Sequence, residues 1–271
     1  MNRGLLAKAL RESWPGTLLF GAGLALVEAI LAFVLPRFQD QISILWSQVP
    51  FIQYLFQALL GADVGGRLGT EVLTCIAWLH PAVLALVWGH ATVHCTRVPA
   101  GEVDRGTVDV LLGMPLSRWQ IYRTEAVLWL ASGIAILLMG AAGNILGSLA
   151  VAGVLRPDPR RLAGVIANLF GLYFAVGGLA WLVSALSDRR GWAMGVVFAF
   201  VLGSFLLNYL AHFWSLADHL SFLSVLHYYR PLPIFRDGAW PVRDIAVLFA
   251  SGTTLWTAGG LIFARRNLST L

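Results

Sequence analysis

The stretch AGEVDRGTVDVLLGMPLSRWQIYRTE, residues 100–125, is the one long polar interval between apolar runs with a dense and ordered charge pattern. A helix over residues 102–112 has an apolar stripe on one face and charges on the other. The stripe consists of Val103, Thr107, Val110 and Leu111. We expect Gly113 to end this helix in a left-handed conformation and Pro115 to prevent its continuation. Ser117 and Gln120 fit an S-x-x-Q capping box, which predicts that a new helix starts there.

The composition predicts an all-α integral membrane protein. Of the 271 residues, 58% are hydrophobic and only 12% are charged, and the mean hydropathy is +0.74. Soluble domains carry about 25% charged residues. The apolar runs between the charges reach the roughly 20 residues that a helix needs to cross a bilayer. The net charge of +5 and the pI of about 9.7 therefore indicate membrane topology and contact with lipid head groups, not nucleic acid.

Six runs are long enough to cross, so the chain, residues 1–271, is predicted to be one transmembrane domain with six spanning helices. The expected spans are residues 17–35, 73–93, 126–150, 162–186, 192–214 and 242–263. Residues 1–16 are basic and apolar and predict an interfacial elbow helix. A signal peptide starts similarly, but here the following apolar run has about 19 residues and no small-x-small site follows it. Residues 36–72 and 215–241 predict outer interfacial or re-entrant segments.

Positive charge predicts the orientation of the chain. Six spans place both termini on one side, together with residues 94–125 and the turn SDRRG at residues 187–191. This side then holds 11 of the 19 basic residues, which favours the cytoplasm. They are Arg3, Lys8, Arg11, Arg97, Arg105, Arg118, Arg123, Arg189, Arg190, Arg265 and Arg266.

The order of residues in the 100–125 stretch resembles the signature of the permease subunits of type-two ABC exporters. The resemblance runs from Glu102 through Arg105-Gly106-Thr107 and Leu111-Leu112 to Pro115-Leu116-Ser117-Arg118. In that family this segment forms the cytoplasmic coupling helix between the second and third spans. Glu125 departs from the pattern, because those permeases usually have a lysine there. The layout of spans and the closing F-x-R-R-x-L pattern at residues 263–268 are also similar.

The resemblance implies a permease subunit, not an enzyme, in the inner (plasma) membrane with both termini in the cytoplasm. Its partners would be two copies of an ABC ATPase, a second permease copy and membrane lipid, and its substrate stays unassigned. The chain has no Walker A string, so no cofactor is expected in it, and ATP and Mg are expected on the partner. Apolar residues would fill a cleft on the ATPase, while Glu102 and Arg105 would pair with its charged groups. The expected docking residues are Glu102, Val103, Arg105, Gly106, Thr107, Val110, Leu111, Leu112, Pro115 and Arg118.

Polar residues within the spans define a candidate substrate path. Glu28 lies well inside the first span, where a carboxylate is costly and functional by default. It is expected either to line a substrate path or to hydrogen-bond within the bundle, and Glu28→Gln is expected to affect transport but not assembly. The other candidates are Asn144, Asn168 and Asn208.

Histidines support an alternative from another class, a membrane redox or metal enzyme. His90 and His94 share one helix face, and His80 and His94 have the spacing by which one helix ligates two haems. A membrane scaffold or immunity protein is a third reading, which differs in lacking substrate movement. Cys75 and Cys95 are about 30 Å apart on one predicted helix, so they are not expected to pair. Gly143-x-x-x-Gly147 predicts close helix packing within or between subunits.

Overall fold

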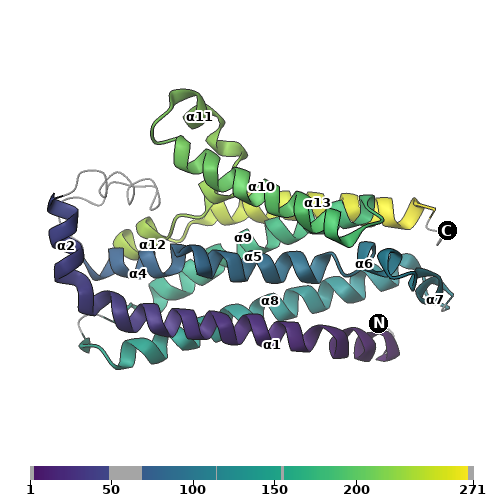
Figure 1. The fold of residues 1–271 in the computed structure, drawn as a ribbon, viewed down its shortest axis with the longest axis horizontal. Helices are drawn as coiled ribbons and strands as arrows, with labels where there is room; N and C mark the ends of the chain where they lie inside the picture. The colour runs from purple at the N-terminus through teal and green to yellow at the C-terminus, as the bar shows by residue number, and fades with distance from the viewer. Residues whose placement is uncertain (1–2, 49–68, 114, 154–155, 268–271) are drawn as a thin grey trace.

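The chain folds as a bundle of helices that are long and apolar enough to cross a membrane (Figure 1). The computed structural model describes residues 3–48, 69–113, 115–153 and 156–267, and these contain helices but no strand. Six segments of this described part qualify as spans, which makes the chain a multi-pass all-α membrane protein. They are Arg3–Ile44, Thr70–Cys95, Arg118–Leu149, Pro159–Leu186, Arg190–Leu210 and Val242–Arg265. Most of the predicted interfacial segment 36–72 falls on residues 49–68, outside the described residues.

The elements follow one another in a simple order. The first half contains α1 (Arg3–Val34), η1 (Leu35–Phe38), α2 (Gln39–Gln48), α4 (Thr70–Leu79), α5 (Pro81–Cys95), α6 (Ala100–Asp104), α7 (Val108–Leu112) and α8 (Arg118–Leu149). The second half contains α9 (Pro159–Leu186), α10 (Arg190–Leu210), α11 (Ser215–Leu220), η3 (Ser221–Leu223), η4 (Val225–Tyr228), α12 (Pro231–Asp237) and α13 (Val242–Arg265).

The predicted elbow helix is not a separate element. α1 continues without a break from Arg3 to Val34, with Pro15 inside it. Leu5 and Ala9 are buried, so the first turns of α1 stay packed in line with the span and do not bend away along the surface.

The second span was predicted as one continuous helix over residues 73–93. In the structure it is broken into α4 and α5. His80 has ψ 133° between α4 and α5, because a residue before proline is disfavoured in the α conformation. Pro81 then occupies the first turn of α5, where its missing N–H costs nothing. The His80 ring caps the new helix by accepting a hydrogen bond from the Ala82 N–H (3.2 Å). Cys75 and Cys95, one on each half, are buried free thiols.

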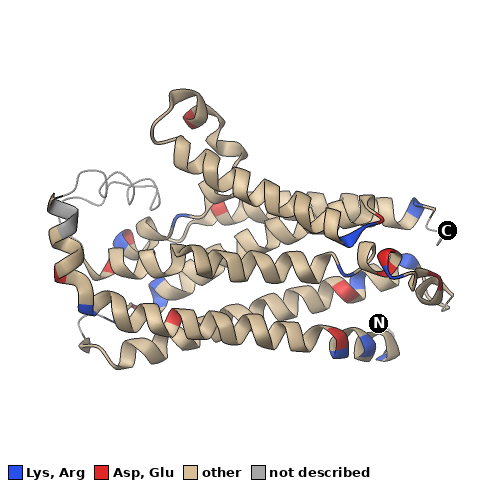
Figure 2. Ribbon diagram, viewed as in Figure 1, with Lys and Arg blue, Asp and Glu red and all other residues tan. Residues whose placement is uncertain are grey.

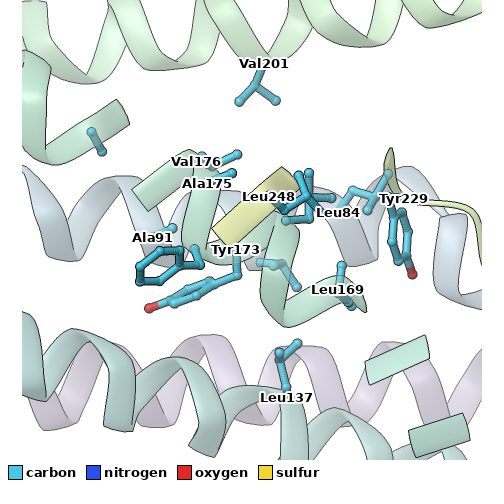
Figure 3. Packing of buried hydrophobic residues seen from close by; sticks show 14 of the residues in the cluster. Leu84, Ala91, Leu137, Leu169, Tyr173, Ala175, Val176, Val201, Tyr229 and Leu248 are labelled. Carbon is cyan, nitrogen blue, oxygen red and sulfur yellow. The ribbon is translucent and has the colours of Figure 1, made fainter. Parts of the chain in front are cut away.

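α9 is the centre of the bundle, because it is buried on nearly every side and contacts α5, α8, α10, α12 and α13. Figure 3 shows its residues Leu169, Tyr173, Ala175 and Val176 among side chains from the surrounding helices. The Tyr173 ring stacks on Trp129 of α8 at a centroid distance of 5.8 Å, and its hydroxyl donates to the Trp129 carbonyl (3.0 Å). α9 therefore fixes the relative positions of the other spans.

The two ends of the bundle differ. One end, here called the coupling end, carries α6, α7, the first turns of α1 and α8, the α9–α10 turn, and both termini of the chain (Figure 1). Charged residues gather there and at the opposite end, whereas the middle of the bundle is nearly free of them (Figure 2). The structure thus places at one end the segments that the count of six spans predicted to be together.

At the opposite end, residues 215–241 form the short helices α11, η3, η4 and α12. α12 packs back against α4 and α9, whereas Trp214, Leu216 and Phe222 are exposed. Tyr229 is buried there and donates its hydroxyl to the Trp78 carbonyl (3.2 Å). Burial raises the pKa of Tyr229 well above its usual value, so this hydroxyl stays protonated and keeps the bond at ordinary pH.

Candidate functional site

The segment between the second and third spans is two short helices joined by a tight turn. The predicted single helix over residues 102–112 is wrong in its middle, because α6 ends at Asp104 and α7 begins at Val108. Gly106 supplies the left-handed residue, with φ +69°, and its N–H bonds the Val103 carbonyl (3.0 Å). The Thr107 N–H bonds the Glu102 carbonyl (3.0 Å), which completes a Schellman motif. Gly113, the predicted left-handed stop, has φ −73°.

The start of α8 agrees with the sequence. The Ser117 hydroxyl accepts from the Gln120 N–H (3.2 Å), and the Gln120 side chain accepts from the Ser117 N–H (2.9 Å). This is the predicted capping box. Arg118, in the first turn, donates to the carbonyls of Phe263 (3.1 Å) and Arg266. This predicted docking residue therefore binds the end of α13 within its own chain.

The predicted apolar stripe does not lie on one face of the folded segment. Val108 and Leu111 are buried, and Leu111 packs in a small cluster with Leu5 of α1 and Ile121 of α8. Val110, the preceding residue of the same helix, is 75% exposed and borders the cavity described below. Consecutive residues of a helix point in different directions, so Val110 and Leu111 do not share one environment. The left-handed Gly106 separates α7 from α6, so residues 102–112 do not form the single helix on which the stripe was drawn. Of the remaining predicted docking residues, Val103 and Leu112 are half-buried, and Gly106, Thr107 and Pro115 are exposed.

Glu102 faces the bundle, not the surface. Its side chain is 5% exposed and accepts hydrogen bonds from Arg105 (3.0 Å) and from the Thr107 hydroxyl, with the Lys8 ammonium 3.6 Å away. Arg105 is about half exposed and remains accessible from outside. Glu102 therefore stabilises the α6–α7 turn and ties it to α1, and only Arg105 of this pair is placed to meet an external charge.

Arg97 joins three helices at the same end. It follows α5, is 8% exposed, and pairs with Glu12 of α1 (2.7 Å) and with Glu125 of α8. Glu125 is itself buried. The position at which this chain departs from the type-two permease signature thus holds the carboxylate of a buried ion pair.

These residues surround a cavity of about 680 Å³ between α1, α5 and the α6–α7 segment. Four basic and two acidic side chains line it, so it carries an excess of positive charge. They are Lys8, Arg97, Arg105, Arg190, Glu12 and Glu102. Deeper in, the lining becomes apolar and aromatic, with Phe20, Val93 and the rings of His90 and His94. A volume of this size is typical of sites for small molecules or for parts of larger ones.

The predicted histidine site is only partly assembled. The rings of His90 and His94 lie 5.8 Å apart between centroids, and His90 contacts the hydroxyls of Tyr173 (3.1 Å) and Thr17 (3.4 Å). His80 is instead the cap of α5, ten residues away along the chain. Within the described ranges, no group of three His, Cys, Asp or Glu side chains is placed to hold a metal ion.

Of the four polar residues of the candidate substrate path, Glu28 and Asn144 meet, whereas Asn168 and Asn208 lie elsewhere. Glu28 is fully buried and accepts a hydrogen bond from the Asn144 amide (2.8 Å), which joins α1 to α8. Asn168 donates to the Tyr228 carbonyl (2.9 Å) and accepts from the Arg230 N–H (3.2 Å), so it holds the segment before α12. Asn208 lies on α10 beside a cavity of only about 20 Å³. None of the four lines the large charged cavity.

Among the residues that line this cavity, Glu12, Arg97 and Arg190 were counted in the sequence only as topology signals or not at all. Others with a predicted role were assigned elsewhere: Glu102, Arg105, Thr107, Val110 and Leu111 to ATPase docking, and His90 and His94 to a metal or haem. Glu12 and Arg97 are 85 positions apart, and Arg97 and Glu125 are 28 apart. Their pairing depends on how α1, α5 and α8 pack. The sequence did contain one signal for this pairing. Glu125 lies at the start of an apolar span, and an acidic residue there requires a partner.

Compared with known proteins, the chain matches no family model, no curated protein and no solved structure.

Proposed function

We propose that this chain is the permease subunit of an ATP-driven ABC exporter, which works as a dimer with two copies of a separate ATPase. The observation that carries the proposal is the architecture of the α6–α7 segment. Val110 is exposed, while Leu111 and Glu102 attach the same segment to α1 and α8. An ATPase that binds the exposed side of this segment would therefore act directly on two spans.

The mechanism follows from this attachment. Closure of the ATPase pair would push on α7, and the buried contacts of Leu111 would transmit the displacement to α1 and α8. Since α1 forms one wall of the charged cavity and α5 another, tilting α1 would change access to the cavity. Alternation between two such arrangements, biased by ATP, is the basis of transport.

Neighbouring residues of α7 provide the test. Val110→Asp places a charge on the exposed side of α7, where it should abolish co-purification with the ATPase encoded nearby and leave the thermal stability of the permease unchanged. Leu111→Asp, the matched variant, buries a charge against α1 and α8 and should destabilise the permease itself. ATP turnover of the complex in liposomes gives the second readout. Full ATPase binding and substrate-stimulated turnover by a stable Val110→Asp protein would refute the docking assignment.

Arg105 tests the charged rim. Arg105→Ala removes an accessible cation that also pairs with Glu102. We expect the complex to remain intact and ATP hydrolysis to become less tightly linked to transport, because rim charges contribute little affinity.

A further inference from the structure

The charged cavity is adjacent to a second cavity of a different character. This second cavity has about 570 Å³, lies between α5 and α10, and has no charged side chain in its lining. Leu84, Trp88, Met194 and Phe198 contribute to its walls. Val93 lines both cavities, and Arg190, which lines the charged one, begins the same helix that carries Met194 one turn later. A charged compartment and an apolar groove thus meet at one point of α5.

The ion pairs leave Arg190 available. Glu12 is engaged by Lys8 and Arg97, and Glu102 by Arg105. Arg190, in contrast, pairs with no carboxylate of the described residues.

The guanidinium of Arg190 donates to the Val93 carbonyl (2.8 Å), while its Nε is buried without a partner. His94, the residue after Val93, has a buried Nε2 that also lacks a partner. The two cavities therefore meet beside a guanidinium whose Nε–H donor is unused.

We propose that the two cavities together bind one anionic amphiphile, with its charged head beside Arg190 and its hydrocarbon chain in the groove between α5 and α10. Arg190 stands at the end of a span, the depth at which basic residues meet lipid head groups. The groove runs from there into the apolar part of the span, so a chain attached to the head group continues along it. This assignment names the substrate class of the proposed exporter. The statement that the amphiphile is transported rests on the proposed function, whereas the statement that it binds does not.

Binding to the purified full chain in an uncharged detergent tests the proposal without the ATPase. The probe is dioctanoyl phosphatidic acid, compared with glycerol phosphate, dioctanoyl phosphatidylcholine and dioctanoylglycerol. We expect phosphatidic acid to bind at least tenfold more tightly than each of the others, because only it satisfies both cavities. Native mass spectrometry or a fluorescence titration gives the affinities.

Two variants with matched controls separate the head from the chain. Arg190→Gln should weaken phosphatidic acid binding about 10- to 100-fold, as expected for loss of a charge-assisted hydrogen bond, and leave dioctanoylglycerol binding unchanged. Its control is Arg189→Gln, at an exposed neighbour outside the cavity lining. Gly195→Leu should weaken both lipids, because a side chain there enters the groove without meeting other atoms first. Gly203→Leu, on the same helix and equally open, is its control.

Three results would overturn the proposal. If glycerol phosphate binds as tightly as phosphatidic acid, the site is for a soluble anion. If phosphatidylcholine or dioctanoylglycerol binds equally well and Arg190→Gln has no effect, the charged cavity takes no part. If Phe198→Cys cross-links two copies and the lipid does not compete, the groove is an interface between copies. Full ATPase binding by Val110→Asp, with normal lipid binding by the parent protein, would refute the docking assignment and leave this inference standing. Loss of ATPase binding in Val110→Asp, with no lipid binding by the parent protein, would remove this inference alone.

Discussion

Arg97 is the residue on which the coupling end depends most. Its guanidinium compensates the buried Glu125 and also reaches Glu12, so it links α5 to α8 and α1. Removing one partner of a buried ion pair typically costs about 3–5 kcal/mol, because the other charge is left uncompensated. We therefore expect Arg97→Ala to lower the thermal stability strongly, measured by unfolding of the detergent-solubilised protein.

The pair Arg105–Glu102, in which only Arg105 is half exposed, is the control for Arg97. Arg105→Ala should cost no more than about 1 kcal/mol, since water screens Arg105 and the buried Glu102 keeps Thr107 and Lys8 as partners. The double variant Arg97→Ala, Glu125→Gln should recover part of the stability lost in Arg97→Ala, because no unpaired buried carboxylate remains. Equal stability of the single and double variants would show that Arg97 acts through packing and not through its charge.

Glu28 is the residue whose expected role the structure changes. Its bond to Asn144 lies between α1 and α8, away from the large cavity, which favours the structural reading over a substrate path. Glu28→Gln retains an acceptor for Asn144 and should leave both assembly and transport near normal. Glu28→Leu leaves the buried amide without its partner and should destabilise the protein by about 1–3 kcal/mol. A transport defect in a stable Glu28→Gln protein would restore the substrate-path reading.

At the scale of elements, the packing of α1 on α8 depends on the glycine pair of the G-x-x-x-G motif. A Cβ on Gly143 or Gly147 would collide with the backbone of Ala25 or Ala29, so the two helices touch only because these side chains are absent. The motif therefore acts within one chain.

We expect Gly143→Ala to destabilise the protein by about 1–3 kcal/mol, as overpacking does when backbone must move. Gly203→Ala, in open space on α10, should be neutral or slightly stabilising. Thermal unfolding of the two variants side by side gives the comparison. Equal stability of both would mean that α1 and α8 are not held in close contact.

The sequence predicted which segments are helices more reliably than it predicted where those helices break. Apolar length placed all six spans, because crossing a bilayer imposes a minimum length on any helix. The S-x-x-Q capping box at Ser117 depends only on residues close together in the sequence, and the structure confirms it. The coupling segment was misread because Gly106 and Gly113 are both able to end a helix, and the choice between them depends on burial of Leu111 against α1 and α8. The charged cavity was missed for the same reason, since its walls come from distant parts of the chain.

At the scale of the whole molecule, the position of both termini at the coupling end makes the orientation measurable. The basic residues of that end predict that it faces the cytoplasm. Arg189 is exposed in the α9–α10 turn at this end, and Arg160 is exposed at the start of α9, at the opposite end. The native Cys75 and Cys95 are fully buried, so a cysteine introduced at either arginine is the accessible thiol among the described residues.

We expect a membrane-impermeant maleimide to label Arg160→Cys in intact cells and Arg189→Cys only in inside-out vesicles. Labelling of the unsubstituted protein in both preparations measures the background from the two native thiols. The opposite pattern would place the α6–α7 segment outside the cell, where no ATP-driven partner reaches it, and would exclude the proposed coupling mechanism whatever the lipid-binding result. Labelling of both variants from the same side would contradict the single membrane crossing made by α9, which separates Arg160 from Arg189.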